Sequence, residues 1–149
     1  MMVCSLAPEP TTKILTRLPY SRELASVWQV ALKRISEPDG VAALKAWNDG
    51  SAGTEQLAIA TRYCLQLLRN AAPGKSVEVR VPPYGAAQII EGPRHTRGTP
   101  PAVIEMSPDT WLMIATGQQT FVEAQRAGSL SASGERADLT EWLPLSRLP

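Results

Sequence analysis

Residues 107–134 read SPDTWLMIATGQQTFVEAQRAGSLSASG, and this stretch contains start and stop signals for three consecutive elements. Ser107 followed by Pro108 is typical of the first positions of a helix, where the missing N–H of proline is not needed, and Gly117 ends that helix. The run Thr120-Phe121-Val122-Glu123 matches a capping box and opens a short second helix that the next glycine ends. Serines then alternate with apolar residues, which predicts a strand.

The residues before this stretch predict three strands. Valines alternate with charged residues over 77–81, which is the period of a half-buried strand. Apolar stretches follow at 84–90 and 102–106, on either side of a loop rich in proline and glycine. We expect these three strands to form an antiparallel meander. Residues 137–145 predict a last strand or a helical turn.

The amino-terminal half of the chain predicts helices. Apolar residues recur at helical spacing over 21–35. Pro38 and Gly40 interrupt this pattern, which resumes briefly over 41–47. Thr54 is expected to cap a third helix, which a Pro-Gly pair ends.

These patterns predict one domain in a chain of 149 residues. Residues 1–20 contain several prolines and no periodicity, so we expect a flexible amino-terminal arm. Residues 21–149 are expected to form the domain, with a helical part over 21–72 and the sheet and short helices over 76–149.

The composition excludes several classes of function. The chain has 15 basic and 14 acidic residues and a net charge of +1, so no nucleic acid partner is expected. The two cysteines, Cys4 and Cys64, are far apart and His95 is the single histidine, so we expect no metal and no cofactor. The longest apolar run, 111–115, is too short to span a membrane, and the start has no basic leader. We therefore expect a cytoplasmic protein.

A series of residues in the second half of the chain matches the pattern of a known family. Its members are Asp109, Trp111, Leu112, Thr116 and Gly117, then Gly128, Leu130 and Gly134, and finally Leu139, Leu143 and Leu145. In this order they resemble the sterol-carrier-protein domain, over roughly residues 55–145. The stretch 82–105, PPYGAAQIIEGPRHTRGTPPAVIE, is similar more narrowly to a bacterial branch of this family found as stand-alone chains.

The resemblance implies an α/β fold with a five-stranded, mostly antiparallel sheet. Helices would cover one face of this sheet and leave an apolar tunnel for a lipid or fatty acyl ligand, and the first helices would be an amino-terminal extension. The same superfamily supplies the carboxy-terminal half of mycothiol-dependent maleylpyruvate isomerases, whose helical half resembles a bundle that binds a divalent metal through histidines. Residues 21–70 contain no histidine, which argues against isomerase chemistry.

Two groups of residues are candidates for ligand binding. In a sterol-carrier-like arrangement, apolar side chains would line the tunnel, although the same spacing is typical of an ordinary packed core; they are Trp111, Leu112, Ala115, Phe121, Val122 and Leu130. Polar side chains would meet the head group; they are Arg80, His95 and Arg97. The alternative for the arginines of this region is pairing with Glu91 and Glu105, which would only fix the hairpin.

These observations lead to one main hypothesis and two alternatives. The main one is non-enzymatic binding or carrying of a lipid, fatty acyl or other apolar carboxylate ligand, with no catalytic residue assigned. The first alternative is a thiol-dependent, isomerase-like enzyme that binds a dicarboxylate through the loop arginines. The second is a protein-interaction module with a vestigial tunnel, in which Trp28 and Trp47 build a contact such as that of a homodimer.

Overall fold

The structure is a computed structural model that describes residues 34–92, 102–145 and 148. The elements in this part are α2 (Glu37–Asn48), α3 (Thr54–Ala71), β1 (Pro73–Val81), β2 (Gly85–Ile89), β3 (Ala102–Met106), α4 (Pro108–Ala115), α5 (Phe121–Arg126) and β4 (Leu130–Ser133). The arm expected over 1–20 and most of the helix expected over 21–35 lie outside the described residues. The mixed α/β class is confirmed, and β2, β3, β4 and the two short helices lie close to the ranges that the sequence predicts. β1 is longer than expected, because it begins at Pro73 and not at Val77.

The strands form one sheet in the order β2-β1-β3-β4. β1 is antiparallel to β2, with Val79 opposite Ala87, and parallel to β3, with Val79 opposite Ile104. β3 is antiparallel to β4. The expected meander is therefore wrong, because β1 lies between the two strands that follow it. Meander turns are short, whereas residues 90–101 provide a connection long enough to pass the start of β1.

The described part of the chain contains four strands rather than the expected five. Residues 137–145 instead form turns that bury Leu139 and Leu145. The backbone N–H of Leu145 donates to the carbonyl of Ala115 in α4 at 3.0 Å, and Pro144 has no N–H to offer a neighbouring strand. Packing against α4 thus replaces strand pairing at this end of the chain.

The sheet has an inner face that is buried and an open face that is polar. Alternate residues of the four strands point to the inner side, which includes Val77, Val79, Val81, Ile89, Ile104, Met106 and Leu130, all buried. The residues between them form the open face, which includes Glu78, Arg80, Gln88, Glu105, Ser131 and Ser133. Such alternation is typical of a sheet that is covered on one side.

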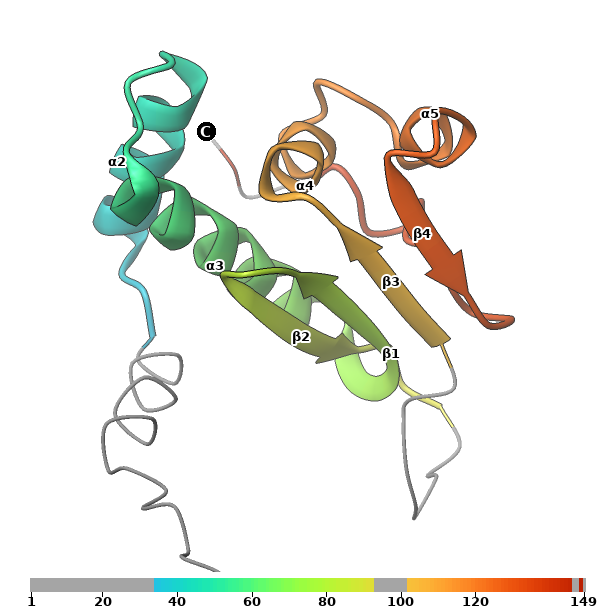
Figure 1. The fold of residues 1–149 in the computed structure, drawn as a ribbon. Coiled ribbons are helices and arrows are strands. Elements are labelled where there is room, and N and C mark those ends of the chain that lie inside the picture. Colours follow the sequence, from blue (N-terminus) through green and yellow to red (C-terminus); the bar gives the residue numbers. More distant parts are fainter. Residues whose placement is uncertain (1–33, 93–101, 146–147, 149) are drawn as a thin grey trace, which may run out of the picture. The chain divides into compact units, whose positions relative to one another are not determined.

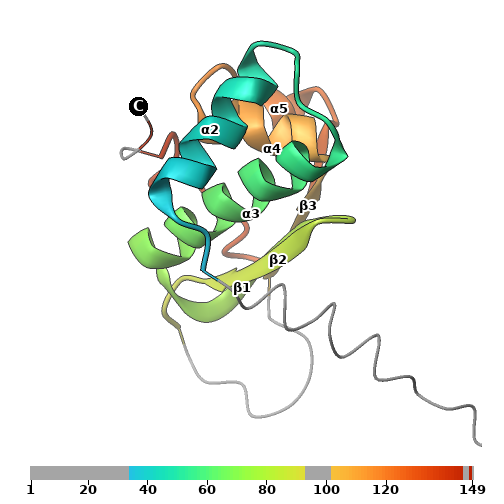
Figure 2. The same ribbon diagram turned by 90° about the vertical axis from the view of Figure 1, so that its left-hand side faces the viewer.

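The helices form layers on the inner side of the sheet. α3 crosses β1 and β2, whereas α4 and α5 lie at the end of the sheet where β3 ends and β4 begins (Figure 1). α2 lies against α3 on the side away from the sheet (Figure 2). The interior between α3, α4, α5 and the inner face is the core of the described unit.

α2 begins earlier than the sequence pattern suggests. Ser36 caps the helix by accepting a hydrogen bond from the Asp39 N–H at 3.3 Å, and Pro38 lies in the first turn, where its missing N–H is tolerated. Gly40 is a packing residue and not a break, because it is buried against the ring of Tyr63 in α3. The second helix was expected over 41–47, and this start is wrong, because α2 begins at Glu37 and includes both Pro38 and Gly40.

The first prediction concerns this close approach of α2 and α3. An added Cβ at position 40 would overlap the Tyr63 ring, so Gly40→Ala should lower the free energy of unfolding by about 1–3 kcal/mol. The higher helix propensity of alanine would by itself raise the free energy of unfolding. Urea denaturation measures the effect, and Gly85→Ala is the control because its added Cβ makes only ordinary contacts, at 3.4 Å or more, with the Leu65 and Arg62 side chains. Equal stability of Gly40→Ala and the wild type would contradict this packing.

Candidate functional site

Trp111 lies at the centre of the predicted tunnel lining, and its side chain is fully buried. It belongs to α4, which Ser107 caps by accepting a hydrogen bond from the Thr110 N–H at 3.3 Å. Its indole N–H donates to the carbonyl of Thr61 in α3 at 3.2 Å. Leu112 and Ala115 of the same helix are also fully buried. α4 is therefore fixed to α3 by one side chain that is both apolar and hydrogen-bonded.

α5 contributes a second, smaller part of the same interior. Thr120 and Glu123 form the capping box that the sequence predicts, and hydrogen bonds from the Thr120 backbone N–H and hydroxyl lower the pKa of the Glu123 carboxyl. Phe121 is 3% exposed and belongs to the core, whereas Val122 is 39% exposed. The structure thus buries Phe121 together with Trp111, and places Val122 on the outside of α5.

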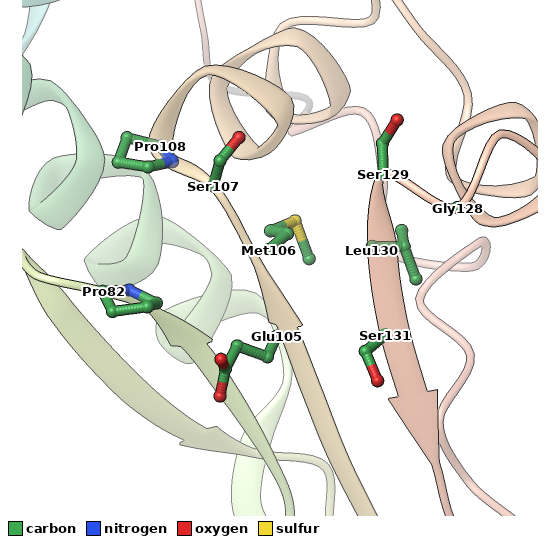
Figure 3. Close-up of a pocket in the computed structure, with 9 residues that line it drawn as sticks. All are labelled: Pro82, Glu105, Met106, Ser107, Pro108, Gly128, Ser129, Leu130 and Ser131. Carbon is green, nitrogen blue, oxygen red and sulfur yellow. The ribbon is translucent and has the colours of Figure 1, made fainter.

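A surface hollow of about 430 Å³ opens next to this interior, at the end of the sheet (Figure 3). We call it the serine hollow, and its lining residues are Pro82, Glu105, Met106, Ser107, Pro108, Gly128, Ser129, Leu130 and Ser131. Met106 and Leu130 are buried members of the core that also line the hollow. The serine hollow therefore lies next to the apolar interior at these two residues, and its other lining residues include three serines and one glutamate.

Arg80 lies beside the serine hollow, on the open face of the sheet and not in the interior. Its neighbour in register on β3 is Glu105, and its Nε donates to the carboxylate of Glu78. The guanidinium thus pairs with Glu78, and Arg80 is linked to the hollow only through its register neighbour Glu105, which is a lining residue. His95 and Arg97, the other expected head-group residues, lie outside the described residues.

Two buried side chains of α3, Thr61 and Cys64, carry a hydroxyl and a thiol in the interior. The Thr61 side chain is fully buried, and its hydroxyl has no hydrogen-bond partner within the described residues. Cys64 is also fully buried, and desolvation raises the pKa of its thiol to about 12. The thiol is therefore protonated near neutrality and is not a nucleophile. Among the described residues no three His, Cys, Asp or Glu side chains gather as metal ligands would.

α2 holds α4 at both of its ends. The indole N–H of Trp47 donates to the Asp109 carboxylate in the first turn of α4 at 3.0 Å. The amide of Gln118, just beyond α4, donates to the Asn48 side chain at 3.1 Å. Trp47 is half-buried. α4 is thus held by α3 from inside and by α2 from outside.

Several residues of this site were not predicted as ligand-binding from the sequence. Met106, Glu105 and the serines of the hollow lie in predicted strands and caps, and only the pairing of β3 with β4 brings them together. Thr61 does carry a sequence signal, because it is a hydroxyl residue on the apolar stripe of α3.

The arrangement defines a class of domain, an α/β fold in which helices cover one face of the sheet and the apolar interior lies next to a polar-rimmed hollow. The model of a family described as bacterial SCP orthologs matches residues 54–145, from the first residue of α3 to Leu145. The chain belongs to this bacterial sterol-carrier-protein-like family. α2 lies outside the matched range. No curated protein matches the chain. No helix in the described residues is long and apolar enough to cross a membrane.

The second prediction compares two tryptophans with different environments. Trp111→Phe removes a buried hydrogen bond and leaves unfilled space, so it should lower the free energy of unfolding by about 2–4 kcal/mol. Trp47→Phe removes a hydrogen bond near the surface and should cost below about 1 kcal/mol. Urea midpoints of the two variants measure the difference. Equal midpoints would show that the buried indole does not fix α4.

The third prediction concerns the Cys64 thiol. Its pKa is raised in the folded state, so this thiol favours folding below the unfolded-state pKa of about 8.5, and that contribution is lost as the pH rises towards about 12. In a Cys4→Ser background, Cys64 should resist iodoacetamide at pH 8 and react readily in urea. Mass spectrometry of the alkylated protein checks this. Rapid alkylation of the folded chain would contradict burial of the thiol.

Proposed function

We propose that the chain binds and carries a lipid-like molecule, such as a fatty acyl or other apolar carboxylate, without changing it chemically. The observation that carries the proposal is the position of Met106 and Leu130, which are buried in the core and also line the serine hollow. An apolar tail that enters there would lie next to the hydrophobic core, whose buried residues are almost all apolar. Membership of the sterol-carrier-protein-like family supports the same function.

The interior offers both a driving force and a polar contact. Each buried methylene contributes roughly 0.8 kcal/mol, so burial of a tail of about ten carbons supplies the roughly 8 kcal/mol that micromolar binding needs. α5 is short and inserts only Phe121 and Ala124, which makes it the part of the layer that a tail displaces most easily. The Thr61 hydroxyl would gain a partner from a polar atom of the ligand, and a buried polar group without a partner costs about 1–3 kcal/mol.

The head group of the ligand would remain at the rim. Arg80 is the cation closest in register to the hollow and suits a carboxylate, although Glu105 lies between the two. His95 and Arg97 remain predictions for the same role. The hydroxyls of Ser129 and Ser131 would complete the hydrogen bonds of the head group, since the Ser107 hydroxyl already caps α4.

The fourth prediction tests the entry point with a matched pair of variants. Ser131 lines the serine hollow and Ser133 does not, although both are exposed on the open face of β4. Ser131→Trp should weaken binding of 11-(dansylamino)undecanoic acid by about ten-fold or more, because the indole fills the hollow, and Ser133→Trp should leave binding unchanged. Fluorescence titration of the dansyl group measures both affinities. Equal effects of the two variants would contradict entry at this hollow.

The wild-type chain supplies the test of the function itself. Gently purified protein should carry a stoichiometric apolar adduct in native mass spectra, which organic extraction identifies. A chain that carries no adduct and binds no dansylated acid at micromolar concentration would overturn the proposal. A stoichiometric divalent metal would instead favour the isomerase-like alternative.

A further inference from the structure

A second hollow lies at the opposite end of the sheet from the serine hollow. It has a volume of about 340 Å³, and its lining residues are Ile90, Arg136, Asp138, Thr140, Glu141 and Trp142. We call it the Trp142 hollow. Ile90 follows β2 beside the start of β1, whereas the serine hollow is lined by Pro82 at the end of β1. The Trp142 hollow is therefore separate from the proposed carrier site, and a ligand bound in it would be independent of the carrier function.

Ile90 holds an unusual backbone conformation in the wall of this hollow. Its φ of 60° is left-handed, which costs a residue with a Cβ roughly 1–2 kcal/mol. Its N–H donates to the Ala72 carbonyl at 2.9 Å, and its own carbonyl accepts from the N–H groups of Lys75 and Ser76 and from the Ser76 hydroxyl. These hydrogen bonds hold Ile90 in its strained conformation. Strained residues held in this way are found most often at ligand sites.

The opposite wall is equally well fixed. Leu139 is fully buried and anchors the turn that carries Trp142, whose backbone N–H donates to the Leu139 carbonyl at 3.0 Å. Asp138 accepts from the N–H of Thr140 at 2.9 Å. Arg136 reaches across and donates to the Glu91 carbonyl at 3.2 Å. The hollow therefore has a preformed shape, as small-molecule sites usually have.

The chemistry of the lining favours a positively charged ligand. The lining contains two carboxylates, of Asp138 and Glu141, and one guanidinium, of Arg136, which already donates to a backbone carbonyl. The half-buried indole of Trp142 and the side chain of Ile90 add apolar surface. In such a lining the carboxylates attract an ammonium group by charge and repel an anion, and the indole offers its ring face to the cation. We propose that the Trp142 hollow binds an organic cation, an amine or quaternary ammonium group attached to an apolar substituent.

Three small probes that share a benzyl group test the proposal on the full chain. They are benzyltrimethylammonium, benzyl alcohol and phenylacetate, which differ in charge. Titration followed by ¹H–¹⁵N spectra should show the cation moving the indole N–H signal of Trp142, which Trp142→Phe assigns. The neutral probe should bind at least about three-fold more weakly, and the anion should leave the signal in place.

A matched pair of carboxylate variants locates the charge that attracts the cation. Glu141→Gln should weaken binding of benzyltrimethylammonium by about five-fold. Glu135 is exposed and does not line the hollow. Glu135→Gln should change binding less than about two-fold, because solvent and salt screen its charge from the bound cation. Equal effects of the two variants, tighter binding of phenylacetate, or an unmoved Trp142 signal would each overturn the proposal. The unchanged remainder of the spectra verifies that the variants are folded.

Discussion

The hydrogen bond from the Trp111 indole to the Thr61 carbonyl is the contact on which the helical layer depends. α4 is too short to be stable alone, so its position must come from packing. The indole supplies that packing and fixes α4 against α3, which itself covers β1 and β2. α5 and β4 follow α4 through short connections, so this contact also helps to position Gly128, Leu130 and the other hollow residues at the start of β4.

Local elements could be predicted from the sequence because their signals are local. Ser107-Pro108 and the capping box at Thr120 begin helices where the structure has them. The central position of β1 was not predictable in this way, since strand order depends on contacts between distant residues. The role of Gly40 was not predictable for the same reason. This residue is needed where the Tyr63 ring of another helix packs against it, and the sequence does not show that contact.

The candidate site was only partly predictable. Trp111, Leu112 and Phe121 were expected to lie together, and they do so in a core that their spacing could not distinguish from a tunnel lining. Periodicity assigned Val122 to the same set, although a six-residue helix buries only one side. The strain at Ile90 has no sequence signature, because left-handed positions are usually read from glycine or asparagine.

α2 lies outside the range that matches the family, yet two of its residues, Trp47 and Asn48, form hydrogen bonds with the two ends of α4. Moving α4 away from α3 would break both of these contacts as well as the Trp111 hydrogen bond. No residue of α2 lines the serine hollow. Substitutions in α2 can therefore change how firmly α4 is held without changing any side chain of the hollow.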